Sequence, residues 1–384
     1  MTIKLFDDGH LKEFDATVVS CERLKKGYGV VLNQTAFFPE GGGQPADIGT
    51  IDSAKVTDVK IKDEVITHIV DKPLEVGSTV HGAIDWDVRF KRMQGHSGEH
   101  IVSGTIHRMF GYDNVGFHMG SEDITLDVNG TLTDDDIATI EYKSNLAVVS
   151  NAKVTITYPD SQTLKDLDYR SKLDLTENVR IVTIEGYDMC ACCAPHVAYT
   201  GEIGVIKITQ AEHYKGGMRI HMLCGFDALK DYTQKNDSVL RVSAMLSAKQ
   251  KEVVKAVERL NEELISQKQA CAELKNQVLQ VKISELKPTD GNMCLFEPAF
   301  DMQTLRSLVN EGVKLTGGIC CGFSGDDQKG YSYIMGSNNV PMREKSKEIN
   351  TALQGKGGGS NEMIQGSVKA TKSEILQYFN VTLN

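Results

Sequence analysis

The sequence lacks several features that would direct a protein into a membrane or out of the cell. No apolar run approaches the roughly 18 consecutive residues that a membrane-spanning helix needs. Residues 1–14 contain no apolar stretch of the secretory type. The nine cysteines are odd in number and three of them fall within residues 190–193, which is not the pattern of a disulfide framework. We therefore expect a cytoplasmic protein with reduced thiols and no membrane segment.

An excess of basic residues is also missing. The chain has 42 lysines and arginines against 52 aspartates and glutamates, so its formal net charge is -10. Proteins that coat DNA regardless of its sequence rely on a broad basic surface, and this class is therefore disfavoured. From Leu286 to the end, basic and acidic residues are equal in number, so the negative excess lies before this point. An RNA of defined shape, bound by a local patch, is compatible with this distribution.

The chain is long enough for more than one domain, and its parts differ in pattern. In residues 1–88, short β-branched runs such as 16–20 are separated by glycines and charged turns, which predicts a β-barrel-like domain. In residues 89–230, apolar residues recur at helical spacing over 89–110, and short strands then alternate with one helical stretch near 133–149. This second part is expected to be an α+β domain, and α+β is the expected class of the whole chain.

Residues 231–288 carry a regular apolar pattern of a different kind. Apolar residues recur with heptad spacing through most of this segment, and Gln267 is one of the few polar interruptions. The pattern predicts a coiled-coil helical segment, which could pair with a second chain or fold back on itself near Gln267. We favour pairing, and therefore a homodimer, because the apolar stripe is too long to leave in water. Residues 289–384 are expected to form a C-terminal α/β domain that contains a glycine-rich loop at 355–366.

Two histidines, His96 and His100, form the strongest local signal for chemistry. Residues four apart lie on one face of a helix, so both imidazoles can bind one cation. Cys192 and His196 form a second pair with the same spacing much later in the chain. Zinc in proteins commonly takes four nitrogen or sulfur ligands, and two such pairs on separate elements complete a tetrahedron. We therefore predict one zinc ion per chain, bound by His96, His100, Cys192 and His196.

Glu99 raises an alternative, because His96 to His100 also has the form H-x-x-E-H, the signature of inverted zinc metalloproteases. In such enzymes the glutamate is the general base, and a glutamate on a later helix is expected as the third ligand. Here Cys192 and His196 are the better candidates for completing the shell, so a protease is the weaker interpretation. A protein that binds RNA without catalysis, and uses zinc only structurally, is a further alternative.

The order of these motifs resembles that in the back half of alanyl-tRNA synthetases. The segment 37–44 resembles the glycine-rich motif that precedes the editing domain, and the segment 331–366 resembles the synthetase's C-terminal domain. The resemblance to the editing domain itself is carried by His96/His100, Asp188 with Cys192-x-x-x-His196, 197–204 and 215–220. The chain leaves no room for an ATP-using aminoacylation core, so ATP is not expected. The pattern is most similar to the long form of the free-standing editing proteins called AlaX.

The resemblance implies a reaction, a partner and a set of residue roles. It implies a zinc-dependent hydrolase that removes serine, and with it glycine, from tRNA(Ala) charged with the wrong amino acid. Mischarged tRNA(Ala) is thus the expected partner, with the C-terminal domain contributing to tRNA binding or oligomerisation. The implied roles are catalysis by Glu99, Thr35 and Gln44, and substrate binding by Gly41, Gly42, Gly43, Arg219 and Lys356.

The loop between Cys192 and His196 departs from the family. The family usually has Cys-Gly-Gly-Thr-His, whereas this chain has Cys-Cys-Ala-Pro-His. Cys193 and Pro195 change the loop, which leaves the preference between serine and glycine open. Cys190 or Cys193 could also replace or supplement Cys192 as a ligand, and the zinc could either activate water or hold the substrate's amino group. A threonyl-type editing module would share the four ligands, but the glycine-rich motifs argue against it.

Overall fold

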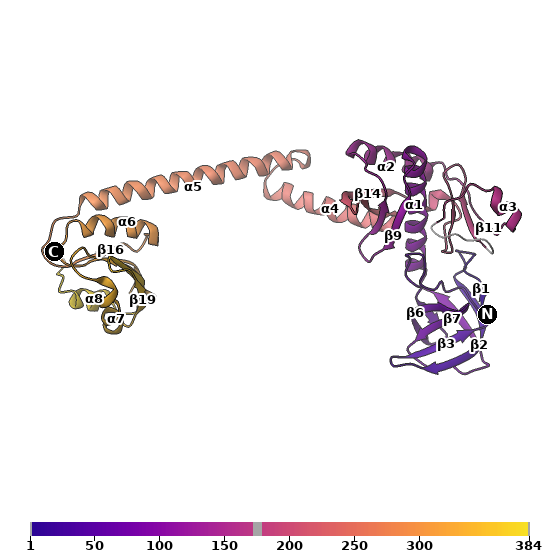
Figure 1. Cartoon of the computed structure of the whole chain (residues 1–384), viewed down its shortest axis with the longest axis horizontal. Coiled ribbons are helices and arrows are strands. Elements are labelled where there is room, and N and C mark those ends of the chain that lie inside the picture. Colours follow the sequence, from indigo (N-terminus) through magenta and orange to yellow (C-terminus); the bar gives the residue numbers. More distant parts are fainter. Residues whose placement is uncertain (1, 172–178, 383–384) are drawn as a thin grey trace. The chain divides into compact units, whose positions relative to one another are not determined.

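A computed structural model describes residues 2–171 and 179–382 of the chain. Two compact units make up the protein, Met1–Arg241 and Val242–Asn384, and Figure 1 labels their elements. Helices and strands are mixed in both units, which confirms the expected α+β class. No helix among the described residues is both long and apolar enough to cross a membrane.

A closed six-stranded barrel begins the first unit, as the short β-branched runs predict. Apolar side chains such as Phe14, Ala16 and Val18 are buried at alternate positions and fill its interior. The strands around the barrel are β2 (Glu13–Arg23), β3 (Tyr28–Leu32), β7 (Val65–Val70), β6 (Ala54–Lys62), β5 (Gly49–Ile51) and β8 (Thr79–Ile84). A separate parallel pair joins β1 (Ile3–Lys4) to β4 (Gln34–Thr35).

The long helix α1 (Trp86–Phe110) follows the barrel directly. Asp85 caps its start by accepting a hydrogen bond from the Val88 N–H, and Gly111 ends it in a left-handed conformation with φ of 70°. Every residue from 93 to 106 is buried, so the middle of this helix has neighbours on all of its faces. The polar side chains in this stretch, the predicted ligands among them, therefore lie in the interior.

Two sheets and two further helices complete the region around α1. The four-stranded sheet runs β14 (Ile206–Tyr214), β15 (Gly217–Cys224), β10 (Ile124–Val128), β9 (Asn114–Met119), and the three-stranded sheet runs β11 (Val154–Thr157), β12 (Ile181–Ile184), β13 (Asp188–Ala191). The helices are α2 (Asp134–Val149), whose start is closed by a capping box, and α3 (Ser161–Asp166), with the 3-10 turn η1 (Thr200–Ile203) after β13. Apolar side chains of α1, α2 and both sheets form one core.

The helical segment predicted at 231–288 is not one continuous helix. The helix α4 (Gly225–Met245) ends, a turn with Ser247 at a positive φ of 49° and the 3-10 turn η2 (Gln250–Glu252) follow, and α5 (Val253–Ser284) then begins. Gln267 lies inside α5, so a fold-back near this residue is contradicted. The break in the helix falls before α5 instead.

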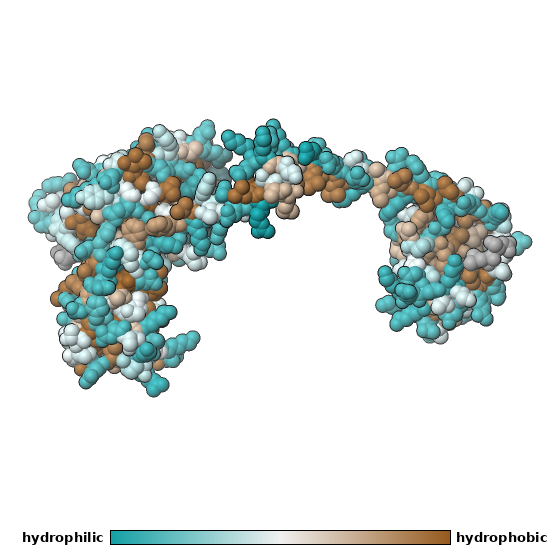
Figure 2. All heavy atoms as spheres, turned by 180° about the vertical axis from the view of Figure 1, so that it is seen from behind, coloured by the Kyte–Doolittle hydropathy of each residue, from teal (hydrophilic) through white to brown (hydrophobic). Residues whose placement is uncertain are grey.

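The apolar stripe of α5 is exposed along its length. Leu260, Leu264 and Leu274 are 50–61% exposed, and Figure 2 shows hydrophobic side chains gathered along the helical segment. Another face of the same helix is covered, because Leu279 and Ile283 pack against α6 (Met302–Val313). Pairing of the exposed stripe with a second chain stays a prediction.

An α/β domain follows α5 in the second unit. Its sheet has the order β16 (Met293–Phe296), β17 (Cys320–Asp326), β18 (Gly330–Gly336), β20 (Met363–Val368), β19 (Lys356–Gly359), and only β16 and β17 among these are parallel. One core lies between the sheet and α6, and another lies beneath α7 (Met342–Ala352) and α8 (Lys372–Tyr378). The glycine-rich segment expected as a loop is instead mostly strand, because β19 and β20 form a hairpin at the sheet edge.

Candidate metal centre

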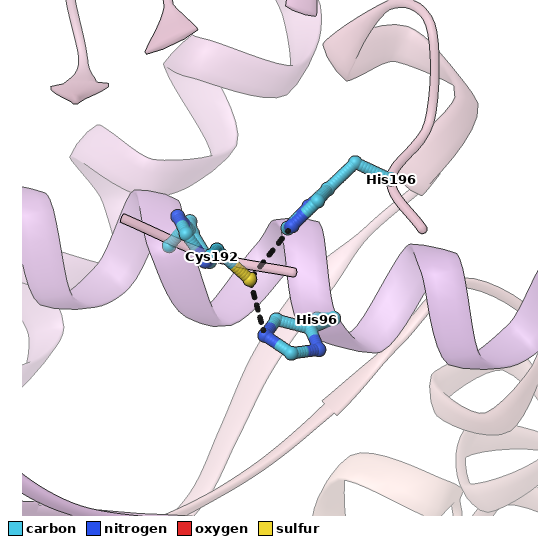
Figure 3. A group of neighbouring side chains, drawn as sticks. His96, Cys192 and His196 are labelled. Atoms are coloured by element: carbon cyan, nitrogen blue, oxygen red, sulfur yellow. Dashed lines mark hydrogen bonds between the residues drawn. The ribbon is translucent and has the colours of Figure 1, made fainter. Parts of the chain in front are cut away.

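The four predicted ligands meet at one point in the first unit. His96 and His100 come from α1, and Cys192 and His196 come from the segment that follows β13. Their ligand atoms all lie within 4.8 Å of one another. The Cys192 Sγ is 3.5 Å from His96 Nε2 and 3.3 Å from His196 Nε2, as the dashed lines in Figure 3 show. The arrangement can hold a metal ion.

Each of the three imidazoles is held at its other nitrogen by a partner outside the cluster. His96 Nδ1 lies 2.8 Å from Gln44 Oε1, and His100 Nδ1 lies 2.9 Å from Asp188 Oδ2. His196 Nδ1 lies 3.0 Å from the Ser97 hydroxyl. With the proton on Nδ1, the Nε2 lone pair of each ring faces the common point, which is the arrangement found around metal-binding histidines.

The electrostatics of the cluster favour metal-binding forms of two ligands. Burial by itself raises the pKa of the Cys192 thiol, but His96, His196 and hydrogen bonds from His100 and His196 outweigh burial and lower that pKa well below its usual range. Burial also lowers the pKa of His196 to about 3, with the charges of the neighbouring histidines acting in the same direction. A thiolate and a neutral imidazole are the forms that bind zinc. A buried thiolate among imidazoles fits a divalent cation.

The neighbouring cysteines occupy different positions from Cys192. Cys190 lies with His100 and Asp188 in a second group whose possible ligand atoms are within 4.8 Å of one another. Cys193 is exposed and belongs to neither group among the described residues. Of the three thiols, Cys192 is thus the one that the structure brings together with all three histidines.

The glycine-rich motif lies against the cluster. Gly41 and Gln44 close a tight turn through two backbone hydrogen bonds of 3.1 and 3.0 Å. Gly43 has a φ of +85°, and a Cβ there would lie 2.5 Å from the carbonyl oxygen of Phe117 in β9, so the close approach requires glycine. The Phe117 ring is in turn 4.8 Å from the His96 ring, centroid to centroid. The turn therefore borders the candidate metal site through Gly43 and Gln44, whereas Gly42 at its tip is exposed.

The three residues expected to act in catalysis are placed differently. Gln44 contacts the ligand His96, as described above. Glu99 is 4% exposed and accepts a hydrogen bond of 2.6 Å from the Asn114 side chain. Thr35 is fully buried, and its hydroxyl lies 2.8 Å from His68 Nε2 in β7. Of the three, Gln44 is thus the one whose hydrogen bond reaches a ligand within the described part of the chain.

The remaining expected substrate contacts are Arg219 in the first unit and Lys356 in the second. Arg219 in β15 forms a two-point ion pair with Asp127, with distances of 2.6 and 2.8 Å. Its neighbours Met218 and Ile220 are buried in the core shared with α1, so Arg219 faces the opposite side of the sheet. Lys356 is exposed in β19 and belongs to the second unit. The structure therefore does not bring Arg219 to the metal site.

Sequence reasoning missed two arginines that support the site, Arg89, which is buried, and Arg170, which is partly buried. Arg89 in α1 pairs with Asp47, just after the glycine-rich motif. Arg170 pairs with Asp188, the partner of the ligand His100. Each is a single charged residue with no motif around it. The one sequence signal that could have indicated such a residue is a charged side chain within an otherwise apolar helix face. Arg89 shows this signal, and Arg170 does not.

Comparisons with known proteins show which protein families the chain is similar to. The family model described as the threonyl and alanyl tRNA synthetase second additional domain matches residues 179–242, which include Cys192 and His196. A second model, described as tRNA synthetases class II (A), matches residues 5–88, the barrel region.

Individual relatives give a more specific similarity than the family models. The chain is 28% identical to the alanyl-tRNA editing protein AlaX-L of Pyrococcus horikoshii, over 98% of this chain and 96% of that protein. It is 27% identical to the alanyl-tRNA editing protein Aarsd1 of Mus musculus, over 95% of this chain and 93% of that protein. It is also 30% identical to the alanine–tRNA ligase of Ignicoccus hospitalis, of which it spans 36%. The predicted resemblance to free-standing alanyl-tRNA editing proteins of the long form is confirmed.

Proposed function

We propose that the protein is a hydrolase that edits in trans, by releasing serine, and also glycine, from tRNA(Ala) charged with the wrong amino acid. The buried cluster of three histidines and one cysteine, bordered by the glycine-rich turn, is the observation that supports this proposal most directly. The names of the relatives that match over nearly their whole length support an editing function on alanyl-tRNA. Each is an alanyl-tRNA editing protein, and we propose by analogy that tRNA is also the partner of this chain.

The chemistry of the substrate makes this function physically reasonable. An alanine-sized apolar pocket in a synthetase cannot strongly reject an added hydroxyl, nor can it exclude the smaller glycine, so a second hydrolytic site is needed. The aminoacyl ester is already an activated bond. The site therefore has mainly to position the carbonyl group and a water molecule.

We propose that His96, His100, Cys192 and His196 hold one zinc ion. Bound zinc would supply a Lewis acid at the ester carbonyl or at the substrate's amino group. Three imidazoles and a thiolate are a donor set typical of zinc, and the three histidines are buried while Cys192 is partly buried. The outer hydrogen bonds fix the direction of each ring, so the protein itself sets the geometry.

Other side chains are assigned roles on the protein side. We propose that Glu99 accepts the proton of the attacking water and that Gln44 keeps His96 oriented. Thr35 and the turn at 41–43 would shape the end of the pocket that receives the amino acid. For Thr35 to recognise a serine hydroxyl, its own hydroxyl has to exchange the hydrogen bond that it makes with His68.

The proposal extends to the organisation of the whole chain. We propose a barrel domain at 1–88, an editing domain at 89–230, a helical segment at 231–288 that dimerises through its exposed stripe, and a C-terminal domain at 289–384 that contributes tRNA affinity. Arg219 and Lys356 would contact tRNA away from the reacting ester. All nine cysteines are unpaired, which supports a reducing compartment such as the cytoplasm.

Deacylation of three substrates tests the function. Ser-tRNA(Ala) and Gly-tRNA(Ala) should be hydrolysed while Ala-tRNA(Ala) is spared, and the His100→Ala variant should lose the activity by orders of magnitude. The exposed Cys193→Ser variant serves as the matched control, because Cys193 is absent from the four-donor group. Faster release of alanine than of serine, or faster cleavage of a peptide, would contradict the proposed substrate class.

A further inference from the structure

Arg170 lies beside the metal site but belongs to none of its motifs. Its Nε donates to Asp188 Oδ1 at 2.8 Å, and its Nη2 donates to Asp188 Oδ2 at 2.9 Å. The same Oδ2 accepts the Nδ1–H of His100 at 2.9 Å. The Asp188 side chain is only 2% exposed. One carboxylate therefore connects Arg170 to a proposed zinc ligand, out of reach of bulk water.

The Arg170 guanidinium also contacts α1 directly. Its Nη2 donates to the Ser103 hydroxyl at 2.8 Å, and Ser103 follows His100 by one helical turn. At the next residue, Gly104, a Cβ would lie 2.8 Å from the Tyr187 carbonyl oxygen and 2.9 Å from Asp188 Oδ1. Any larger residue would push these atoms away from α1. The contact between α1 and the start of β13 is therefore both close and polar.

The backbone of Arg170 holds the same strand from its other side. The Arg170 N–H donates to the Met189 carbonyl at 2.8 Å, and the Ala191 N–H donates to the Arg170 carbonyl at 2.9 Å. These two bonds form an isolated bridge to β13. Cys192 is the next residue after this strand. Arg170 thus contacts both elements that carry proposed ligands, α1 through its side chain and β13 through its backbone.

We propose that Arg170 is a positioning residue of the metal centre, which holds Asp188 and β13 so that His100 and Cys192 face one cation. The proposal rests on the zinc site put forward above. A carboxylate bound at both oxygens by a planar guanidinium has a fixed orientation. The imidazole that donates a hydrogen bond to this carboxylate is therefore also held in one orientation. A lysine would supply the charge without the two-point geometry. Partners of this kind commonly contribute about 10- to 100-fold to metal affinity.

Metal binding by the full chain provides a readout that is independent of hydrolysis. Zinc affinity is measured by competition with a chelator, and the cobalt(II) absorption spectrum reports the geometry of the ligands. We expect Arg170→Met to bind zinc about 10- to 100-fold more weakly than the wild type. Arg170→Lys should recover only part of this loss, and the cobalt bands of both variants should shift or weaken.

Arg219→Lys is the matched control. Arg219 binds Asp127 with the same two-point geometry in the same unit, at 2.6 and 2.8 Å, and Asp127 has no hydrogen bond to a proposed ligand among the described residues. Its zinc affinity should equal that of the wild type. An equal loss in Arg219→Lys would show general destabilisation and would count against the proposal.

The two possible failures can be told apart. If the wild type binds zinc and both Arg170 variants keep its affinity and its cobalt spectrum, the positioning role is wrong while the metal centre stands. If the wild type binds no zinc, the metal centre itself is wrong, and the role of Arg170 falls with it. Should Arg170→Met fail to fold, Arg170→Lys decides, because it keeps the buried positive charge.

Discussion

The ion pair between Arg89 and Asp47 should be costly to break, because both side chains are almost completely buried. Arg89 is 0% exposed and Asp47 is 1% exposed. The Arg89 Nε lies 3.0 Å from each carboxylate oxygen, and its other nitrogens donate to the carbonyls of Ala36 at 2.6 Å and Gly9 at 3.2 Å. Asp47 also accepts the Phe38 N–H at 2.6 Å. Replacing Arg89 with methionine would leave the buried carboxylate with Arg92 alone, whose Nη1 lies 3.9 Å from Asp47 Oδ1.

The expected loss follows from this burial. Removing one partner of a buried ion pair typically costs about 3–5 kcal/mol of the free energy of unfolding. For a unit the size of Met1–Arg241, each kcal/mol lowers the thermal midpoint by about 2–4 °C, so Arg89→Met should lower it by about 6–20 °C. The single tryptophan, Trp86, lies in α1, so its fluorescence follows unfolding of the first unit.

Two comparisons make this measurement decisive. Arg219→Met breaks a pair whose side chains are 28% and 18% exposed, and it should cost only about 0–1 kcal/mol. The double variant Arg89→Met, Asp47→Leu should recover part of the loss, because the buried carboxylate that lost its closest cation is gone. A midpoint for Arg89→Met within about 2 °C of the wild type would refute the reasoning, since it would mean a loss below about 1 kcal/mol.

Four further predictions address the metal, the tRNA, the dimer and pH. The double variant His96→Ala, Cys192→Ala should lose the stoichiometric zinc that metal analysis finds in the wild type; undiminished zinc would contradict the ligand assignment. Lys356→Ala should weaken tRNA binding modestly and reduce the slope of its salt dependence by about one; an unchanged slope would exclude a phosphate contact. Leu260→Glu should convert a dimer to a monomer in sedimentation, whereas a monomeric wild type would rule out the dimer itself. Burial lowers the pKa of His68 to about 4, so the unfolded chain takes up this proton before the folded one, and about 3 kcal/mol of stability should be lost as the pH falls from about 6.5 to about 4. His68→Gln should lack this loss in unfolding experiments across that range.

The grouping of the four proposed ligands could be predicted from the sequence because each pair is local. His96 and His100 share one helix face through their spacing alone, and Cys192 and His196 lie in one short segment. The sequence could not show how far apart the two pairs lie in space, because that depends on the packing of α1 against β13. It also could not show that the Thr35 hydroxyl bonds with His68 in the barrel, since the orientation of a side chain is decided by tertiary neighbours.

The helical segment shows a specific limit of periodicity. The residues between Met245 at the end of α4 and Val253 at the start of α5 are 246–252, seven in number, which is one heptad. Val239, Leu246 and Val253 are apolar at heptad spacing before, within and after this break, so the spacing gives no sign that the helix stops. The chain turns at Ser247, which has a positive φ of 49°. Serine is common in turns but is a weaker turn signal than glycine or proline.

Both arginines, Arg89 and Arg170, lie where a second element meets α1, and stability alone does not account for their ion pairs. A buried ion pair is often no more stabilising than apolar residues of the same volume, because two charges must be removed from water. What an apolar pair cannot supply is direction. Asp47, fixed by Arg89, binds the Phe38 backbone beside the glycine-rich turn that carries the partner of His96, and Asp188, fixed by Arg170, orients His100. A proposed site that needs four donors aimed at one point gains from fixed orientation at both contacts, and this accounts for two charge pairs placed where other elements meet α1.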